Sequence, residues 1–316
     1  MVRRQNRQVN PLRIVFAGSP AAAVPSLQRL AAGPHDIAAV ITREDAPLGR
    51  KKIMTATPVA VQAGAAGIPI VRANRLDPVA EQILALEPEL GVIVAYGGMI
   101  REPLLSGPRL GWINLHFSLL PRWRGAAPVQ RAIMAGDDET GAAVFQLVSE
   151  LDAGPVYATL RQPIGAHQTA GHLLEQLSIS GAELLAGVVD SLASGTARGV
   201  EQTGEITVAP KLVLDDGRLD WSAPADRVDA RFRGATPEPG PFMELDGERV
   251  KVLDATIDRD SSPLAPGLLE LRAGRLLVGT ATDPIHVVTV HPAGKRAMPA
   301  VDWWRGRPAG AAVVAA

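Results

Sequence analysis

The first third of the chain alternates apolar stretches of strand length with amphipathic stretches of helical length, and this alternation constrains the fold more than any other feature. The clearest strand is Gly91–Tyr96, whose unbroken apolar character is typical of a strand buried on both faces. Other expected elements are strands at Leu12–Ala17, Ile37–Thr42 and Ile68–Val71 and helices at Val59–Ala66 and Asp77–Leu86. Such alternation predicts a Rossmann-like α/β domain with an open, mostly parallel sheet. Sheets of this kind bind ligands beyond the carboxyl ends of their strands.

The composition limits the classes of protein to which the chain can belong. Its 316 residues suffice for two domains, and its 47% hydrophobic content is that of a globular protein rather than a disordered one. The absence of cysteine excludes disulfides, thiolate catalysis and cysteine-ligated zinc. No apolar run approaches the roughly 18 residues of a membrane helix, and the basic start of the chain lacks the apolar core of a secretory signal. We therefore expect a cytoplasmic protein without a membrane segment.

A change in the sequence pattern near residue 201 predicts a second domain. From there on, short apolar stretches separated by turn signals replace the alternation of strands and helices. Met243–Leu245 and Arg249–Leu253 flank Asp246-Gly247, which is a strong signal for a two-residue hairpin turn, and Ala273-Gly274 indicates another. These hairpins predict a small antiparallel β-barrel of OB-like type. The expected organisation is an N-terminal extension at 1–11, the α/β domain at 12–200, a linker at 201–210 and the barrel at 211–316.

One extended run near the middle of the chain carries an amide and an imidazole two positions apart. Because side chains alternate across a strand, Asn114, His116 and Ser118 are expected on one face. Ile113 and Leu115 then point to the other face. An amide that donates and an imidazole that carries a proton, both at the ligand edge of the sheet, suit the stabilisation of charge on a reacting carbonyl. The alternative is a strand whose polar end merely faces water.

Asp152 is a candidate partner for this imidazole. It follows the expected strand Val144–Val148, and we expect the loop after that strand at the same ligand edge as His116. A carboxylate there would orient the imidazole and favour its charged form. The alternative is an ordinary turn residue, since aspartate before glycine is common in turns.

Basic residues cluster between the second expected strand and the helix that follows it. The cluster comprises Arg43, Arg50, Lys51 and Lys52, with Arg72 and Arg75 further along. With a net charge of −1, the chain needs such a local patch to bind an anionic partner. The run therefore suits phosphate contacts, although a solvated surface is the alternative. Basic residues of the second domain that offer a further patch are Arg231, Arg233, Lys295, Arg296, Arg305 and Arg307, while Trp303 and Trp304 are expected to pack in its core.

Another possible phosphate site lies early in the chain. Gly18-Ser19-Pro20 occupies the place of a dinucleotide-binding fingerprint. The second and third glycines of that fingerprint are absent, which argues against a nicotinamide cofactor.

Longer strings of residues resemble one known family. Asn114-Leu-His116 followed by Ser118-Leu-Leu-Pro121 resembles the core that folate-dependent formyltransferases share. The 16-residue string Ser118–Ile133 is similar to the branch whose members formylate methionine carried by initiator tRNA. The likeness extends to Ile14–Pro20, Gly49–Lys52, Leu151–Pro155 and Pro292–Met298, and it covers most of the chain.

This resemblance implies an activity and a set of site residues. The implied reaction transfers a formyl group from 10-formyltetrahydrofolate to the amino group of methionine on initiator tRNA. The implied sites are a catalytic set of Asn114, His116 and Asp152, a folate loop of Ser118, Leu119, Leu120 and Pro121, and tRNA contacts at Arg50, Lys51 and Lys52. The barrel would help to hold the tRNA. No metal is implied, and we expect the chain to act as a monomer.

Two other functions remain open at this point. A formyltransferase that acts on a small amine, such as a nucleotide sugar, would share the first domain but would need neither the basic loop nor the barrel. An RNA-binding protein with a degenerate catalytic domain is the non-enzymatic alternative. The presence of Asn114, His116 and Asp152 argues against that alternative.

Overall fold

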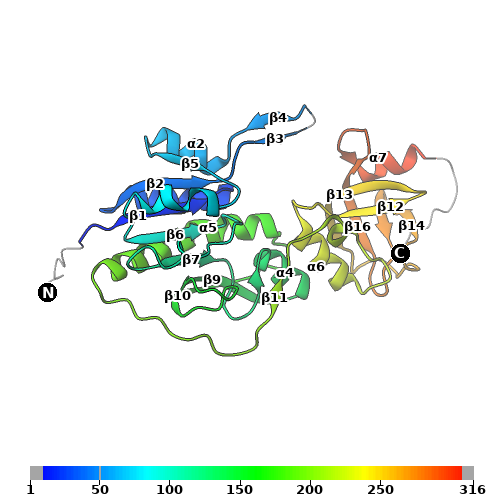
Figure 1. Cartoon of the computed structure of the whole chain (residues 1–316). Coiled ribbons are helices and arrows are strands. Elements are labelled where there is room, and N and C mark those ends of the chain that lie inside the picture. Colours follow the sequence, from blue (N-terminus) through cyan, green and yellow to red (C-terminus); the bar gives the residue numbers. More distant parts are fainter. Residues whose placement is uncertain (1–9, 50, 308–316) are drawn as a thin grey trace, which may run out of the picture. The chain divides into compact units, whose positions relative to one another are not determined.

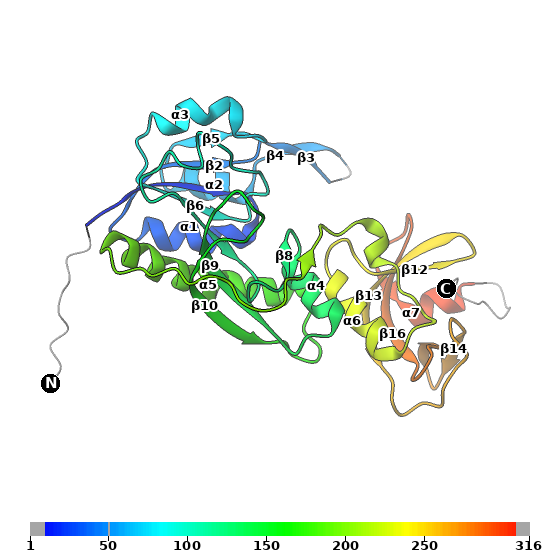
Figure 2. The same cartoon turned by 60° about the horizontal axis from the view of Figure 1, so that its bottom comes forward.

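The structure, a computed structural model, describes residues 10–49 and 51–307. These residues form two compact units, each with a sheet of its own (Figures 1 and 2). Within the described ranges, unit 1 comprises residues 10–128, 139–163 and 174–209, and unit 2 comprises residues 129–138, 164–173 and 210–307. None of the helices in these ranges is long and apolar enough to cross a membrane.

Unit 1 is built on a seven-stranded sheet with the strand order β10-β9-β7-β6-β1-β2-β5 (Figure 1). The strands are β1 (Arg13–Gly18), β2 (Asp36–Thr42), β5 (Ile70–Arg72), β6 (Leu90–Val94), β7 (Trp112–His116), β9 (Glu139–Gln146) and β10 (Val156–Pro163). Neighbouring strands from β7 to β5 run parallel, whereas β9 and β10 form an antiparallel edge. The predicted open, mostly parallel sheet is therefore confirmed.

The direction of β9 corrects one expectation. Its register pairs Gln146 with Ile113 and Ala143 with His116, so β9 ends beside the start of β7. The chain after β9 therefore does not leave from the carboxyl edge of the parallel strands, as we expected from the sequence. An apolar pattern specifies which side chains are buried but not the direction of a strand. The segment 147–155 nevertheless brings Asp152 to His116.

Helices cover both faces of this sheet. They are α1 (Val24–Ala31), preceded by η1 (Ala21–Ala23), α2 (Pro58–Ala65), α3 (Ala80–Leu84), preceded by η2 (Asp77–Val79), and α5 (Ala170–Ala193). α1 contacts α2 through Gln28 and Gln62 and contacts α5 through Arg29 and Glu183. The opposite face packs against α3, where Ile83 joins a core cluster with residues such as Val15, Ile41, Ile93 and Trp112. Local signals fix the start of α2, because Thr57 accepts the Ala60 N–H and Pro58 occupies the first turn.

The basic stretch between β2 and α2 is a hairpin, although the sequence suggested only a loop. β3 (Ala46–Leu48) pairs antiparallel with β4 (Ile53–Thr55). The turn closes with a hydrogen bond from the Lys52 N–H to the Gly49 carbonyl. The hairpin extends away from the seven-stranded sheet in both views (Figures 1 and 2). Strands of three exposed residues lack the alternating burial by which a sequence reveals a strand.

Unit 2 contains an antiparallel sheet with the order β12-β13-β16-β15-β14, to which β17 adds beside β16. The elements are α4 (Pro128–Ala135, mostly in this unit), η3 (Leu214–Gly217), α6 (Ala225–Ala235), β12 (Phe242–Leu245), β13 (Glu248–Ile257), β14 (Leu269–Arg272), β15 (Arg275–Val278), β16 (Ile285–Pro292), β17 (Met298–Pro299) and α7 (Ala300–Arg305). Both expected hairpin turns are confirmed, with positive φ at Asp246, Gly247, Ala273 and Gly274. The sheet encloses its own core and is compatible with a small barrel-like domain.

Trp303 belongs to that core, as the sequence predicted, and Trp304 packs against it. Unit 1 also contains two very short strands. β8 (Arg124–Gly125) and β11 (Val208–Ala209) form a parallel pair. This pair lies beside Asp152, whose carboxylate accepts from the Gly125 N–H.

Candidate active site

Strand β7 sets the directions of Asn114 and His116. Asn114 pairs directly with Phe145 of β9, and the His116 ring stands edge-on to Phe145 with ring centroids 6.4 Å apart. Both side chains therefore lie on the Phe145 face of the sheet. Leu115 packs on the other face, where a Cβ added at Gly181 of α5 would lie 3.1 Å from it. The predicted alternation holds as far as His116, where β7 ends.

His116 is buried between two acceptors. Its Nε2 lies 2.8 Å from the carbonyl oxygen of Trp123, and its Nδ1 lies 3.7 Å from Oδ2 of Asp152. A carbonyl oxygen only accepts, so Nε2 donates its proton there, and a carboxylate likewise offers no proton to Nδ1. The Trp123 carbonyl therefore fixes a proton on Nε2, and the Nδ1 side of the ring faces the Asp152 carboxylate.

Asp152 is held from a second direction. The backbone N–H of Gly125 donates to Asp152 Oδ2 at 2.8 Å. The carboxylate is buried, and the Asp152 backbone has a φ of +47°, in the left-handed region that few residues other than glycine adopt. Asp152 is thus a turn residue, as the simpler interpretation of the sequence held, and its carboxylate also faces His116.

The Asn114 side chain retains hydrogen-bonding capacity in the folded protein. Its Oδ1 atom is buried and has no hydrogen-bond partner among the residues that the structure describes. A buried acceptor without a partner costs on the order of 1–3 kcal/mol, so such atoms in a site are commonly completed by a ligand. A ligand donor close to Asn114 would satisfy this oxygen.

The loop after β7 carries the four residues assigned to folate by resemblance. Ser118 is fully buried, and its hydroxyl donates to the Arg122 carbonyl at 2.6 Å, so it closes the loop. Because β7 ends before it, the strand alternation that we expected to include Ser118 does not reach it. Leu119 packs against β9, where a Cβ added at Gly141 would lie 2.7 Å from it. Pro121 is buried and Leu120 is half-buried.

The adjoining carboxyl edge is braced by Arg43. Its guanidinium donates to the carbonyl oxygens of Gly97 at 2.7 Å and Tyr96 at 3.3 Å. The buried Tyr96 hydroxyl donates to the Ala73 carbonyl at 2.6 Å. Burial raises the pKa of Tyr96, and the nearby charge of Arg43 acts in the opposite direction. Arg43 is therefore a structural residue here, although the sequence grouped it with the basic run.

Lys51 and Lys52 lie exposed at the turn of the β3–β4 hairpin. In the described part of the chain, neither has a carboxylate partner, whereas Arg72 pairs with Asp45 at 3.1 Å. Arg75 likewise pairs with Asp77. Arg50, the third residue assigned to tRNA, lies outside the described residues. The two hairpin lysines are thus the described members of the run that can meet an external anion.

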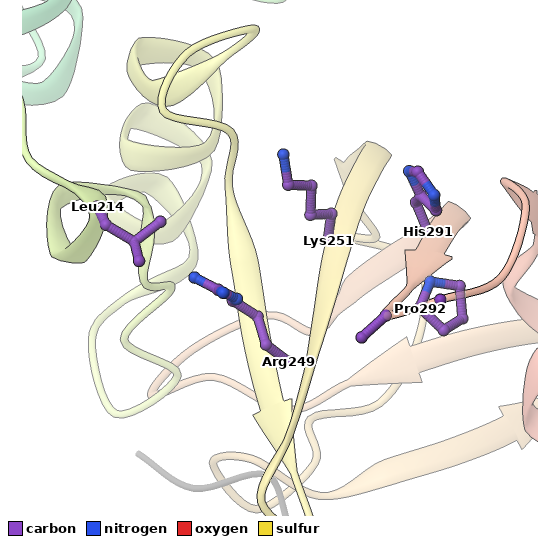
Figure 3. Close-up of a pocket in the computed structure, with 7 residues that line it drawn as sticks. Leu214, Arg249, Lys251, His291 and Pro292 are labelled. Atoms are coloured by element: carbon purple, nitrogen blue, oxygen red, sulfur yellow. The ribbon is translucent and has the colours of Figure 1, made fainter. Parts of the chain in front are cut away.

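Unit 2 holds a second basic site that sequence reasoning missed. A cavity of about 450 Å³ is lined by Leu214, Arg249, Lys251, His291, Pro292, Ala293 and Gly294. Lys251 pairs directly with His291 across β13 and β16, and their side chains project to the same side of the sheet (Figure 3). The signal was the spacing Arg249-x-Lys251, which places both cations on the exposed face of one strand.

Basic residues that the sequence singled out in this unit are partly engaged elsewhere. Arg233 pairs with Asp229 at 2.6 Å, and Arg307 pairs with Asp246 at 2.6 Å. By contrast, no ion pair of Arg249 or Lys251 occurs within residues 10–49 and 51–307. Over the same ranges, no group of three His, Asp or Glu side chains is arranged to hold a metal ion.

Comparison with known proteins agrees with this fold. The chain matches the Formyl transferase family over residues 12–189 and the Formyl transferase, C-terminal domain, family over residues 211–308. The chain therefore belongs to the formyltransferase family.

Particular relatives carry a more specific name. The methionyl-tRNA formyltransferase of Clavibacter sepedonicus is 58% identical over 93% of this chain and 97% of its own length. The protein of the same name from Leifsonia xyli subsp. xyli is also 58% identical, with the same coverage. The one from Thermobifida fusca is 49% identical over 93% of this chain and 96% of its own length.

Solved structures share the fold at low sequence identity. The N-formyltransferase from Helicobacter canadensis, in complex with folinic acid and dTDP-3-aminofucose, has a TM-score of 0.68 at 14% identity and covers 87% of this chain and 98% of that chain. HypX from Aquifex aeolicus in complex with tetrahydrofolic acid has a TM-score of 0.64 at 16% identity over 92% of this chain. The chain spans 46% of the length of that HypX structure, so this likeness concerns the fold alone.

Proposed function

We propose that the protein transfers the formyl group of 10-formyltetrahydrofolate to the α-amino group of methionine on initiator tRNA. The product is N-formylmethionyl-tRNA for translation initiation. The observation that carries this proposal is the grouping of Asn114, His116 and Asp152, with a buried imidazole facing a carboxylate on the same face of the sheet as an amide oxygen that has no partner among the described residues. Relatives named methionyl-tRNA formyltransferase, at 49–58% identity over nearly the whole chain, support the choice of acceptor.

Formyl transfer to an amine requires stabilisation of negative charge more than it requires a strong base. A free α-amino group has a pKa of about 7.7–8.0, so a useful neutral fraction exists near pH 7. When that amine attacks the formyl carbon, a new carbon–nitrogen bond forms and negative charge develops on the formyl oxygen. The bond between the formyl carbon and the folate nitrogen then breaks, and the proton that the amine loses ends on the departing folate nitrogen. Donors placed in advance around this oxygen lower the barrier, and one such donor is typically worth about 10²–10³ in rate.

Asn114 and His116 supply that stabilisation in our proposal. The Asn114 amide nitrogen donates to the formyl oxygen, while its unpartnered oxygen accepts an N–H of the attacking amine. The Nε2 atom of His116 is committed to the Trp123 carbonyl. At 3.7 Å from Asp152, Nδ1 makes no close hydrogen bond and is the ring nitrogen left to hydrogen-bond to the substrate. Asp152 orients the imidazole.

The folate donor fits the residues that follow β7. When bound, it supplies the activated formyl group. We assign its contacts to Ser118, Leu119, Leu120 and Pro121, which follow His116 directly. The half-buried Leu119 and Leu120 offer apolar surface for a flat ring system, and the buried Ser118 hydroxyl keeps the loop closed.

The tRNA meets basic side chains in both units in this proposal. In unit 1 these are Lys51 and Lys52 of the hairpin, together with Arg50. In unit 2 they are the cavity residues Arg249, Lys251 and His291. Among the described residues, Lys51, Lys52, Arg249 and Lys251 have no carboxylate partner, so they suit phosphate contacts, which give affinity and position but no sequence preference.

We further propose the organisation and cellular context of the protein. Residues 12–200 act as the catalytic domain, 201–210 as a linker and 211–316 as an OB-like tRNA-binding domain, after an extension at 1–11. The matched families, at 12–189 and 211–308, support this division. The protein acts as a monomer in the cytoplasm, where charged tRNA is used. Light scattering of the purified protein, alone and with tRNA, tests the monomer.

An acceptor comparison tests the function. The protein is incubated with labelled 10-formyltetrahydrofolate and, in separate reactions, with methionyl initiator tRNA, methionyl elongator tRNA and an amino-sugar nucleotide. We expect transfer to the initiator tRNA. Transfer to the amino sugar with none to tRNA would support the small-amine enzyme instead. Binding of tRNA without folate binding or transfer would support the non-enzymatic alternative.

A further inference from the structure

The segment between α5 and β11 runs beside the candidate site without regular secondary structure of its own. It forms a single bridge, Val200 to Val156, before β11 pairs with β8. Two of its residues, Gln202 and Thr207, form hydrogen bonds with the loops that hold Asp152 and His116. All of these residues belong to unit 1. The linker expected from the sequence, residues 201–210, covers the second half of this segment.

Gln202 clamps the backbone of the Asp152 loop. Its Nε2 donates to the carbonyl oxygens of Asp152 at 2.7 Å and Gly154 at 2.9 Å. Its Oε1 accepts from the buried Arg124 guanidinium, with distances of 2.7 Å to Nη2 and 3.2 Å to Nε. Both donors and both lone pairs of the amide are thereby used. Because all four of its hydrogen bonds are made to protein groups, the Gln202 side chain has a defined position and can hold the groups bonded to it in place.

This clamp and the site share one carboxylate. Arg124 is followed by Gly125, whose N–H donates to Asp152 Oδ2 at 2.8 Å. Gln202 therefore fixes the backbone of Asp152 directly. Through Arg124, it also helps to fix the neighbouring Gly125, whose N–H holds the Asp152 carboxylate. Asp152 needs such support because its backbone φ of +47° lies in the left-handed region, which side chains rarely adopt without help from their surroundings.

Thr207 braces the opposite side of the imidazole. The Trp123 N–H donates to Thr207 Oγ1 at 2.8 Å, and the Arg124 N–H donates to the Thr207 carbonyl at 2.9 Å. The Trp123 carbonyl then accepts from Nε2 of His116. Both nitrogens of the His116 ring thus face groups that this segment holds in place.

On the basis of the formyl-transfer site proposed above, we propose that Gln202 is a positioning residue for the reaction. It acts through Asp152 and touches no substrate. Without its two donors, the Asp152 loop relaxes from the left-handed conformation, and the carboxylate loses its place beside Gly125 and His116. Misplacement on the scale of 1 Å lowers turnover by as much as about 100-fold. Folate and tRNA binding do not depend on this contact, so the loss falls on kcat rather than on KM.

The test compares three single variants. Gln202→Met keeps the volume and removes the amide. Gln202→Glu keeps the acceptor for Arg124 but removes both donors, so it tests the donors even if Gln202→Met does not fold. Gln28→Met, at an exposed glutamine on α1, is the matched control. We expect kcat for charged initiator tRNA to fall about 10- to 100-fold in both Gln202 variants, with both KM values within about two-fold of wild type.

A double-mutant cycle separates positioning from general destabilisation. Asp152→Asn is measured alone and combined with Gln202→Glu, and thermal melts monitor folding. We expect little further loss of kcat in the double variant, because Gln202 acts through Asp152. A Gln202→Glu enzyme as active as Gln28→Met, or losses that multiply in the double variant, would overturn the role of Gln202 and leave the proposed function standing. Wild-type turnover by Asp152→Asn would overturn the proposed site itself.

Discussion

At the scale of single residues, the candidate site keeps polar groups in arrangements that cost stability. Asn114 has a buried oxygen without a described partner, and Asp152 has a left-handed backbone. Such arrangements gather at functional sites, where a ligand or a reaction makes use of them. His116 lies between these two residues. It is on the same face of the sheet as Asn114, and its Nδ1 is 3.7 Å from the Asp152 carboxylate.

Asn114→Ala tests the amide directly. We expect kcat to fall by about 10²–10³, the loss typical for one oxyanion donor. We expect thermal stability to stay level or rise slightly, because the variant removes a buried acceptor without a partner. Steady-state kinetics and thermal melts measure both, with Asn74→Ala, at an exposed asparagine bonded to Glu44, as the control. Turnover equal to that of the control would exclude Asn114 from catalysis.

Asp258 provides a residue-scale test of stability in unit 2. Its carboxylate accepts from the Ser261 hydroxyl at 3.0 Å and from the backbone N–H groups of Asp260 and Ser261, and it pairs with Arg275 at 2.8 Å. Burial alone would raise the pKa of Asp258, but these hydrogen bonds and the charge of Arg275 hold the pKa below its usual value. Because the folded-state pKa is depressed, the stabilisation is present above the unfolded-state pKa of about 3.9 and is lost as the pH falls through the lower folded value.

We therefore expect Asp258→Asn to lower the free energy of unfolding at pH 7 by about 1–3 kcal/mol. The difference from wild type should shrink below about pH 4, where the unfolded chain takes up the proton. Denaturant unfolding of the whole protein, followed by tryptophan fluorescence at both pH values, measures it. A difference that does not change with pH would mean that the charge of Asp258 contributes nothing.

At the scale of elements, the sequence predicted those features that burial patterns and turn chemistry encode. The continuous apolar run gave β6, alternation placed Asn114 and His116 on one face of β7, and the turn at Asp246-Gly247 located the hairpin of β12 and β13. Strand direction is not encoded in this way, so the antiparallel course of β9 was missed. The approach of Asp152 to His116 depends on that course and on a loop conformation, so spacing alone left it undecided.

The β3–β4 hairpin and the unit 2 cavity were missed for related reasons. The hairpin strands are short and exposed, so they carry no apolar pattern. The cavity gathers Arg249, Lys251 and His291 from two strands, and only the pairing register brings His291 opposite Lys251. The overall charge balance of the domain did not reveal this site, because the site depends on where each cation points and not on the number of cations.

The hairpin predicts a specific effect of its lysines. In a Lys51→Ala, Lys52→Ala variant, we expect a higher KM for tRNA, an unchanged KM for the folate and little change in kcat. Each lost phosphate contact should reduce the slope of log affinity against log salt by about 1. An Arg109→Ala, Arg161→Ala variant, which removes two exposed arginines paired with Glu89 and Glu139, controls for the change in net charge. An equal rise in the KM for the folate would place these lysines in the folate site instead.

At the scale of the whole molecule, each unit has its own core and presents its own cations. Unit 1 carries the proposed chemistry, and unit 2 carries the cavity lined by Arg249, Lys251 and His291. An enzyme for a small amine needs only the first of these. An acceptor as large as tRNA can use both, which is why the cations of unit 2 bear on the choice of substrate.

An Arg249→Ala, Lys251→Ala variant tests this use of unit 2. We expect weaker binding of tRNA and a smaller salt dependence, with kcat at saturating tRNA close to that of wild type. Arg259→Ala, at an exposed arginine that pairs with Asp226 and Asp283, is the control. If the double variant bound tRNA as tightly as the control does, the cavity would not be part of the tRNA-binding surface.

The most direct test of the central claim is the kcat/KM for formyl transfer to methionyl initiator tRNA in wild type, His116→Ala and Asp152→Asn. We predict efficient transfer by wild type and losses of at least about 10²-fold in each variant, with thermal melts showing that both remain folded. Transfer by both folded variants at close to the wild-type rate would contradict the account, because the buried imidazole and its carboxylate would then have no part in the reaction.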